Sequence, residues 1–279
     1  MIGLNRSGTK WLSNLISAHS NVYAVKHEAH FGILESNVFN DFGRMFPSID
    51  SPELQTAFTT IWSESDFLKI TETDLPALMN REKPKTVFDA FRLVMSTAAT
   101  RHNSRYWLQK CSPVQFATLR NEFADSKRVF IYRKLDEVLV SAFENANECG
   151  QSAGRMRQIT SYCLQNQVLQ NLMKESGSIC VAYEELKTNP EKVIEGVLNF
   201  LDLKSTNQTF DLGFQPNTSF AGAKVRPKLS FKDKFFKNVL TLVLRIIPRG
   251  FPLKIWKFIR RKAVPSILRG TYRVSRNLN

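Results

Sequence analysis

Residues 1–18 read MIGLNRSGTKWLSNLISA, and this stretch decides the fold. The apolar run at residues 1–4 predicts the end of a short buried strand. In residues 8–18 the apolar side chains recur with the spacing of one helical face, which predicts a helix. A strand, a glycine-containing loop and a helix therefore follow one another. In that order the first N–H groups of the helix and its dipole converge on one point, which favours a bound phosphate.

The residue types in the loop fit an anion site. Gly8 lets the backbone pass close to a ligand, Arg6 and Lys10 add positive charge, and Ser7 and Thr9 add hydroxyl donors. The nucleotide-triphosphatase pattern places lysine directly after this glycine, whereas here threonine comes first. The loop alone leaves two interpretations open: a phosphate-binding loop, or an ordinary glycine turn at the start of a helix.

The rest of the chain extends the alternation of strands and helices. Further strands are predicted at residues 22–25, 106–109, 128–132 and 179–182. The clearest helix is 190–201, with Asn189 as its N-cap. Residues 53–101 predict mostly helix, with breaks at Pro76 and Pro84. The pattern predicts an α/β fold, with three α/β/α layers around a central parallel sheet. We expect one domain over residues 1–216 and a C-terminal extension over residues 217–279.

Positive charge is concentrated in that extension. Sixteen lysines and arginines but one acid follow Ala223, leaving 23 basic and 24 acidic residues before them. A near-neutral domain with a basic tail does not favour nucleic acid as the partner. The tail alternates cations with bulky apolar residues, which predicts one or two amphipathic helices. These helices either contact an anionic membrane surface or pack on the domain with a solvated basic face.

Cysteine usage and the start of the chain bear on metal sites and compartment. The four cysteines show neither Cys-x-x-Cys spacing nor a paired histidine, so we expect no zinc site and no disulfide framework. Reduced thiols, together with a glycine motif where a secretory signal would stand, predict a cytoplasmic protein, peripheral to a membrane if the tail binds one. No metal is required by the motifs.

The loop resembles a known nucleotide-binding motif. The run Arg6-Ser7-Gly8-Thr9-Lys10-Trp11 is similar to the 5′-phosphosulfate loop of sulfotransferases that use 3′-phosphoadenosine 5′-phosphosulfate (PAPS), whose fold resembles that of P-loop nucleotide kinases. The resemblance implies that Arg6 and the backbone of residues 7–10 hold the 5′-phosphate and the sulfuryl group. Trp11 stands where many members stack a tryptophan on adenine; the alternative is a core residue of the helix.

Two later motifs match the rest of that nucleotide site. Arg133 ends a predicted strand and Ser141 follows eight residues later, the family's spacing for 3′-phosphate binding. A guanidinium and a hydroxyl suit a phosphate that ADP and ATP lack. The run VAYEEL resembles the family's Tyr-Glu-Glu-Leu segment, which brings Tyr183 toward the adenine edge. Arg226 lies where members usually carry a basic loop that closes over the 3′-phosphate.

The acceptor side resembles the heparan-type and bacterial carbohydrate branch. The run Lys-His-Glu-Ala-His-Phe at residues 26–31 is similar to the branch's Glu-Pro-His-Phe segment. It implies Glu28 as general base and His30 as its polar neighbour. Two departures are Ala29 in place of proline and Ile33 in place of a frequent aspartate. His27 is a competing base, and an ordinary solvated loop is the alternative.

Lys110 completes the predicted catalytic set. The run Gln-Lys-Cys-Ser-Pro resembles the branch's Glu-Lys-Thr/Ser-Pro segment, which places Lys110 near the leaving phosphate. Ser112 stands where the small-molecule branch has its catalytic histidine, so that branch's mechanism is not supported. We expect sulfuryl transfer from PAPS to a hydroxyl or amine of a carbohydrate, glycolipid or small metabolite. The alternatives are a nucleotide kinase or triphosphatase, and a non-catalytic nucleotide-binding protein at a membrane.

Overall fold

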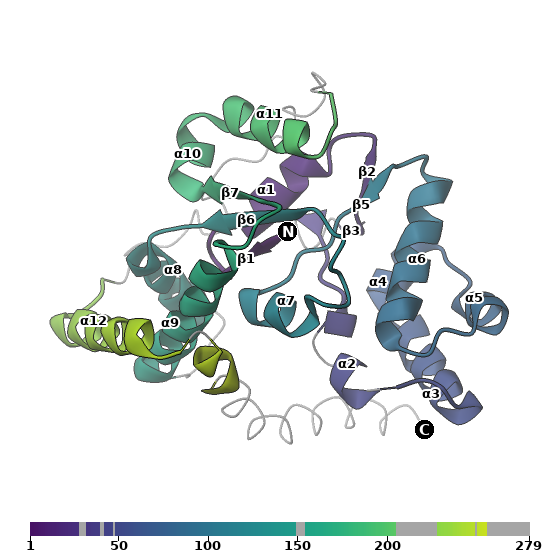
Figure 1. Cartoon of the computed structure of the whole chain (residues 1–279), viewed down its shortest axis with the longest axis horizontal. Helices are drawn as coiled ribbons and strands as arrows, with labels where there is room; N and C mark the ends of the chain where they lie inside the picture. The colour runs from purple at the N-terminus through teal and green to yellow at the C-terminus, as the bar shows by residue number, and fades with distance from the viewer. Residues whose placement is uncertain are drawn as a thin grey trace. The chain divides into compact units, whose positions relative to one another are not determined.

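The structure, a computed structural model, describes residues 1–27, 32–39, 42–46, 48–148, 154–204, 228–248 and 250–255 (Figure 1). Two compact units divide the chain. The first comprises Met1–Arg133 and Gly177–Ala223, and the second comprises Lys134–Ser176 and Lys224–Asn279. The expected domain boundary at residue 216 lies outside the described residues.

Three parallel strands form the centre of the first unit. They are β1 (Ile2–Gly3), β6 (Arg128–Tyr132) and β7 (Ser178–Ala182), and they lie in the order β1-β6-β7. Ile2 faces Phe130 in the register, and Phe130 faces Cys180 in the next strand. The middle strand RVFIY is buried along its centre, as expected for an apolar run covered on both faces.

A second parallel pair continues this sheet. It consists of β2 (Val22–Tyr23) and β5 (Tyr106–Trp107). Beyond β5, the N–H of Leu108 donates to the Tyr23 carbonyl (2.8 Å), and the N–H of Cys111 donates to the Met1 carbonyl (3.0 Å). Alternate N–H groups of an extended strand point to opposite sides. Residues 106–111 therefore lie between β2 and β1, which confirms the predicted parallel sheet.

Helices cover both faces of the sheet in this unit (Figure 1). Val129 and Ile131 of β6 share a core with α1 (Thr9–Ile16) and α11 (Pro190–Phe200). The residue between them, Phe130, points the other way and meets Phe116 of α7 (Pro113–Leu119), with ring centroids 6.4 Å apart. The alternation along one strand thus places helices on opposite faces and confirms the three α/β/α layers.

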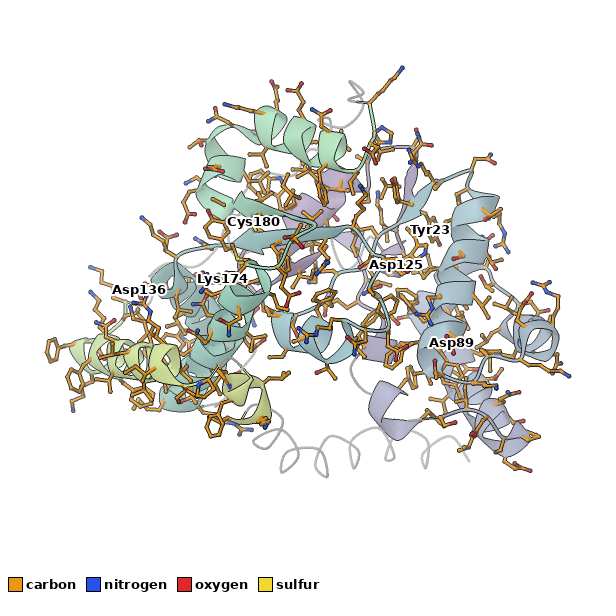
Figure 2. The ribbon with its side chains drawn as sticks, in the orientation of Figure 1. Tyr23, Asp89, Asp125, Asp136, Lys174 and Cys180 are labelled. Carbon is orange, nitrogen blue, oxygen red and sulfur yellow. The ribbon has the colours of Figure 1, made fainter. Side chains whose placement is uncertain are left out.

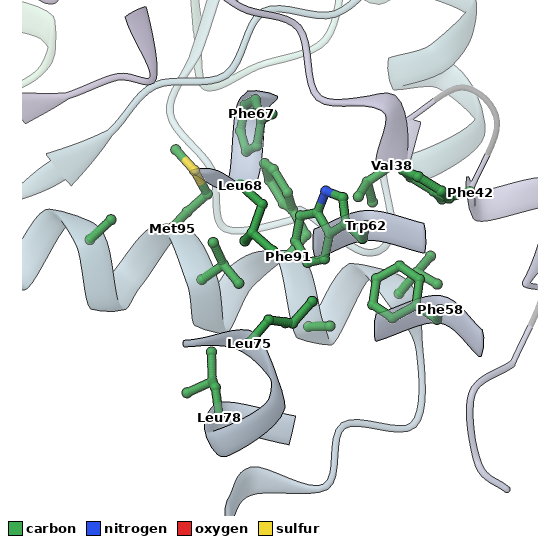
Figure 3. Packing of buried hydrophobic residues seen from close by; sticks show 14 of the residues in the cluster. Val38, Phe42, Phe58, Trp62, Phe67, Leu68, Leu75, Leu78, Phe91 and Met95 are labelled. Carbon is green, nitrogen blue, oxygen red and sulfur yellow. The ribbon is translucent and has the colours of Figure 1, made fainter. Parts of the chain in front are cut away.

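A helical region follows β4 (Gly32–Ile33) and has its own aromatic core (Figure 3). Its elements are η2 (Asn37–Phe39), α2 (Phe42–Met45), α3 (Pro52–Ser63), α4 (Asp66–Thr71), α5 (Leu75–Glu82) and α6 (Val87–Arg101). Phe58, Trp62 and Phe91 are completely buried at its centre. The predicted breaks are both present: α4 ends at Thr71, before Pro76, and α5 ends at Glu82, before Pro84. Pro76 itself lies in the first turn of α5, where a missing N–H leaves no hydrogen bond unmade.

A short antiparallel hairpin and one further helix complete the first unit. The hairpin pairs β3 (Lys26–His27) with β4 (Gly32–Ile33). After β7 the chain enters α10 (Tyr183–Thr188), so Tyr183 begins a helix at the carboxyl end of a strand. Tyr23, labelled in Figure 2, ends β2 and stacks on His102, with ring centroids 4.9 Å apart.

The second unit is helical in its described part. It contains α8 (Leu135–Glu148), α9 (Arg155–Leu172), α12 (Phe231–Ile246) and a helical turn at residues 251–255. Leu244 of α12 packs with Ile159 and Cys163 of α9. Lys237 of α12 forms an ion pair with Asp136 of α8, which is labelled in Figure 2. Among the described helices, none has the length and apolar character needed to cross a membrane.

Candidate functional site

The loop between β1 and α1 lies where an α/β sheet binds ligands. The strands lie in the order β2, β5, β1, β6 and β7. From β1 the chain first goes to β2 and β5 on one side of β1, and later to β6 and β7 on the other side. The carboxyl end of β1 is therefore the point where the strand order reverses, which is the usual ligand site of such sheets. The predicted phosphate loop starts there.

The loop holds its shape through left-handed backbone and internal hydrogen bonds. Arg6 and Gly8 have φ values of 70° and 87°. Ser7 is fully buried, and its Oγ donates to the Leu4 carbonyl at 2.7 Å. A Cβ on Gly8 would lie 2.5 Å from Cδ2 of Tyr183, so glycine is required both by the backbone and by this close approach. In this structure the Ser7 hydroxyl shapes the loop from inside.

The N-terminus of α1 follows this loop directly and has no side-chain cap. Its N-cap is Gly8, which has no side chain to accept from the first-turn N–H groups. Thr9 and Trp11 of the first turn are buried, whereas Lys10 is half-buried. An uncapped helix N-terminus with its partial positive charge attracts an anion.

Three cations and one carboxylate gather at this end of the sheet. The pKa of Lys10 is lowered by burial first, and then by the neighbouring charges of Lys110 and Arg6, while Glu35 opposes the shift. Lys110 is nearly buried, and its Nζ lies 2.5 Å from Oε1 of Glu35. With Glu35 as the single acid beside Arg6, Lys10 and Lys110, the cluster carries excess positive charge. A bound phosphate or sulfate group would neutralise this excess positive charge.

Glu35 is a site residue that sequence reasoning missed. It lies two residues beyond Ile33, the position where the resembled branch often carries an aspartate. The sequence therefore did contain a carboxylate near the expected position, but two residues later, at Glu35. Its ion pair with Lys110 links the segment after the hairpin to the segment after β5.

Arg133 connects the end of β6 to the loop after β1. Its Nη1 donates to the Arg6 carbonyl at 3.3 Å, and its Cζ lies 4.3 Å from the ring centroid of Tyr183. Tyr183 in turn meets Trp11 edge-on, with ring centroids 6.1 Å apart. Both rings are buried and belong to the core that α1 shares with β6 and α11. Ser141 lies on α8, within the second unit.

The hairpin that carries the predicted base is anchored to α1. Oδ1 of Asn14 accepts from the N–H of Ile33 at 3.2 Å, and Nζ of Lys26 donates to the Ser17 carbonyl at 2.7 Å. Gly32 has a φ of 120°, and a Cβ there would lie 2.1 Å from Oδ1 of Asn14. The helix that begins at the phosphate loop thus also fixes both strands of the hairpin.

Some predicted site residues fall outside the described part. Glu28, His30 and Arg226 are among the residues that the structure leaves undescribed. His27, the competing base, ends β3 and is half-buried. Ser112 is the N-cap of α7: its side chain accepts from the N–H of the third helical residue in a capping box, a structural use for this hydroxyl.

Cysteine and metal chemistry find no support at this site. Cys111, the neighbour of Lys110, is buried, and burial raises the pKa of its thiol to about 11. It remains a protonated thiol at neutral pH, which is a poor nucleophile. In the described part of the chain, no three His, Cys, Asp or Glu side chains are placed to hold a metal ion.

The chain is similar to a known family and to two solved structures. A family model described as the Sulfotransferase family matches residues 1–207. Two solved structures are similar to the chain. The "Sulfotransferase Domain from the Curacin Biosynthetic Pathway" is 15% identical, with a TM-score of 0.49 over 75% of this chain and 74% of that one. The "Sulfotransferase Domain from the Synechococcus PCC 7002 Olefin Synthase" is 14% identical, with a TM-score of 0.45 over 85% and 92%. No curated protein matches significantly.

Proposed function

The chain belongs to the sulfotransferase family, and from this premise we propose that it transfers a sulfuryl group from PAPS to a hydroxyl or amine. One observation carries the choice of donor. Arg133, at the end of β6, reaches the loop after β1 through the Arg6 carbonyl and stacks on Tyr183. The residues expected to meet the two phosphate ends of PAPS are thereby fixed to each other.

The 5′-phosphosulfate belongs at the N-terminus of α1 in this proposal. The Gly8 backbone and the first-turn N–H groups provide directional donors, and Arg6, Lys10 and Lys110 provide charge. Binding of the anion offsets the mutual repulsion that lowers the pKa of Lys10. Glu35 keeps Lys110 directed into the cluster through the 2.5 Å ion pair.

The 3′-phosphate distinguishes PAPS from ADP and ATP. Arg133 is the proposed ligand for it, because a guanidinium binds phosphate through two parallel hydrogen bonds and stays charged at all relevant pH values. Ser141 and Arg226 stay sequence-based candidates for the same phosphate. Tyr183, over which Arg133 stacks, is the proposed neighbour of the adenine.

The proposed reaction is an in-line displacement at sulfur. The acceptor oxygen or nitrogen bonds to sulfur while the bond from sulfur to the phosphate oxygen breaks, and the acceptor proton passes to Glu28. The leaving phosphate of 3′-phosphoadenosine 5′-phosphate (PAP) gains negative charge, which Lys110 and Arg6 neutralise. His30 supports Glu28. Asn14 of α1 accepts from the N–H of Ile33, so the strand β4 that follows residues 28–31 is held to the helix that begins at the phosphate loop.

The acceptor is expected to be a carbohydrate, a glycolipid or a small metabolite. The use of Ser112 as the cap of α7 supports the carbohydrate branch, since the small-molecule branch has a catalytic histidine there. A positioned carboxylate base can accept the proton of either a sugar hydroxyl or an amine as the bond to sulfur forms.

Two measurements test this function. Calorimetric titration should give a clearly tighter Kd for PAP than for ADP or ATP, because ADP and ATP lack the 3′-phosphate. Incubation of sulfur-labelled PAPS with glycan, glycolipid and small-metabolite pools should then transfer the label to one pool. The Lys110→Met variant, which keeps the side-chain length without the charge, should transfer little. Equal affinity for PAP, ADP and ATP would reject PAPS as the donor.

A further inference from the structure

Helix α12 has two apolar faces, and only one of them is covered. On the inner face Leu244 is buried against α9, with Phe236 and Leu240 packed beside it. On a neighbouring side of the helix, centred about 120° further around its axis, lies a row that we call the outer face: Phe231, Phe235, Val239, Leu242, Val243 and Ile246. All six side chains are exposed, Phe231 to 83% and Ile246 to 78%. At 3.6 residues per turn they fall within an arc of about 120°.

This exposure is concentrated in one place. Of the ten large apolar side chains that are exposed in the described part of the chain, seven lie between Phe231 and Phe251. The other three, Leu54, Ile61 and Met156, stand on α3 and α9. Isolated exposed apolar residues need no explanation, but a continuous row marks a surface that binds something.

The exposed charges that α12 itself carries have a single sign. Asp233, the one acid of α12, is buried, caps the helix with Ser230 and binds Arg155 at 3.1 Å. Lys237 is engaged with Asp136. The exposed charges that remain on the helix are those of Lys232, Lys234 and Arg245. The exposed surface of α12 is therefore apolar and cationic, because its one acidic side chain, Asp233, is buried.

We propose that α12 docks on an anionic lipid bilayer, with its outer face among the acyl chains and Lys232, Lys234 and Arg245 at the lipid phosphates. At 1.5 Å per residue its 16 residues measure about 24 Å, less than the hydrocarbon thickness, so the helix lies in the interface. A second copy of the chain would bring like charges together across a two-fold interface. Nucleic acid would engage the cations and leave the apolar row in water.

Vesicle co-sedimentation tests the proposal with the full chain. Vesicles of phosphatidylcholine with phosphatidylserine should bind the protein, and vesicles of phosphatidylcholine alone should bind it much more weakly. The triple variant Phe231→Ser, Phe235→Ser, Leu242→Ser should weaken binding at least tenfold. The triple variant Lys232→Glu, Lys234→Glu, Arg245→Glu should weaken it by about a hundredfold or more, since each cation near an anionic surface adds to affinity.

Control variants test whether vesicle binding depends on the outer face itself or only on the number of apolar and charged residues in the protein. Leu54→Ser, Ile61→Ser, Met156→Ser removes the three exposed large apolar groups that lie outside residues 231–251, and Lys174→Glu, Lys187→Glu, Lys192→Glu reverses exposed charges on other helices and loops; both variants should bind vesicles like the parent protein. Circular dichroism and the Tm should show that all four variants are folded. A Phe235→Trp variant should gain a blue-shifted emission component on vesicles, and brominated lipids should quench it.

Three results would overturn the proposal. The parent protein fails to bind anionic vesicles, or the outer-face variants bind as well as their matched controls. Light scattering shows a lipid-free dimer that the Phe231→Ser, Phe235→Ser, Leu242→Ser variant loses, which would make the outer face a contact between copies. None of these measurements uses sulfuryl transfer, so their outcome is independent of the proposed enzymatic function.

Discussion

Helices α1 and α12 both gather positive charge, but they do so in opposite surroundings. At the N-terminus of α1, Arg6, Lys10 and Lys110 converge on a loop whose backbone is fixed by buried contacts. Along α12 the cations stand apart on an exposed face beside a row of apolar side chains. The same residue types thus form a closed cluster in one region and an open surface in the other.

The difference shows how burial changes the strength of the interactions between charged groups. Partly buried charges interact through a lower effective dielectric constant than exposed ones, and salt screens them less. At α1 this is visible in the lowered pKa of Lys10, where burial and neighbouring cations disfavour the charged form until an anion arrives. The cluster at α1 therefore suits one anion in one geometry, whereas the outer face of α12 suits a surface that carries many anions.

The largest expected effect is a loss of turnover at the α1 site without a loss of PAP affinity. Glu28→Gln keeps the size of the side chain but removes the proton acceptor, so turnover should fall by about 10²- to 10⁴-fold. PAP affinity should stay the same, because the amide does not alter the cation cluster. His27→Gln is the matched control and should retain most of the turnover. Full turnover in Glu28→Gln with loss in His27→Gln would transfer the role of base to His27.

The second effect concerns the rigidity of the loop. Gly8→Ala places a Cβ 2.5 Å from Cδ2 of Tyr183 at a φ of 87°, so we expect a loss of about 2–3 kcal/mol in the free energy of unfolding and weaker PAP binding. Gly196→Ala, in the interior of α11 with open space around it, should stabilise by about 0.5–1 kcal/mol. Denaturant unfolding measures both. Equal values would show that the loop is not constrained.

The third effect is a pH dependence of donor binding. Because the pKa of Lys10 lies below its ordinary 10.5 in the free protein, Lys10 loses its proton before an ordinary lysine does. A bound anion raises that pKa again, so PAP binding takes up a proton and affinity should fall as pH rises toward 10.5. Lys10→Arg should flatten the profile, since arginine does not titrate there. An unchanged profile in Lys10→Arg would exclude Lys10 as the titrating group.

The smallest effect concerns how α12 is held on its unit. Burial opposes ionisation of Asp233, but hydrogen bonds from Ser230 and the charge of Arg155 outweigh it and lower the pKa. The resulting stability is present above the ordinary value of 3.8 and is lost as pH falls through the lowered pKa. Asp233→Asn should destabilise α12 by about 1 kcal/mol at neutral pH. Hydrogen exchange of α12 measures this, and unchanged protection would assign the docking to apolar contacts alone.

How far the sequence predicts the structure depends on how local each signal is. The loop, the strand RVFIY and the helix after Asn189 are specified by neighbouring residues, and the structure has them within a few positions. The breaks predicted at Pro76 and Pro84 are equally local, because proline is disfavoured in a helix interior and tolerated in a first turn, where Pro76 lies.

The candidate site divides in the same way. The strand–loop–helix with the proposed anion site was predictable from its own residues, whereas the ion pair of Glu35 with Lys110 joins segments 75 residues apart in the sequence. The anchoring of the hairpin by Asn14 is equally non-local, as is the stacking of Arg133 on Tyr183. A family resemblance supplied the order of the motifs, but only folding brings these partners together.

The most direct test of the account assigns each phosphate of the donor to its residue. Kd values of PAP and of AMP, which has the 5′-phosphate alone, should be measured for the parent protein, Arg133→Ala and Lys10→Ala. Arg133→Ala should weaken PAP at least about tenfold, as expected for a lost charge-assisted contact, and leave AMP nearly unchanged. Lys10→Ala should weaken both ligands. If Arg133→Ala weakens PAP and AMP equally, Arg133 only supports the loop, and the assignment of the 3′-phosphate is contradicted.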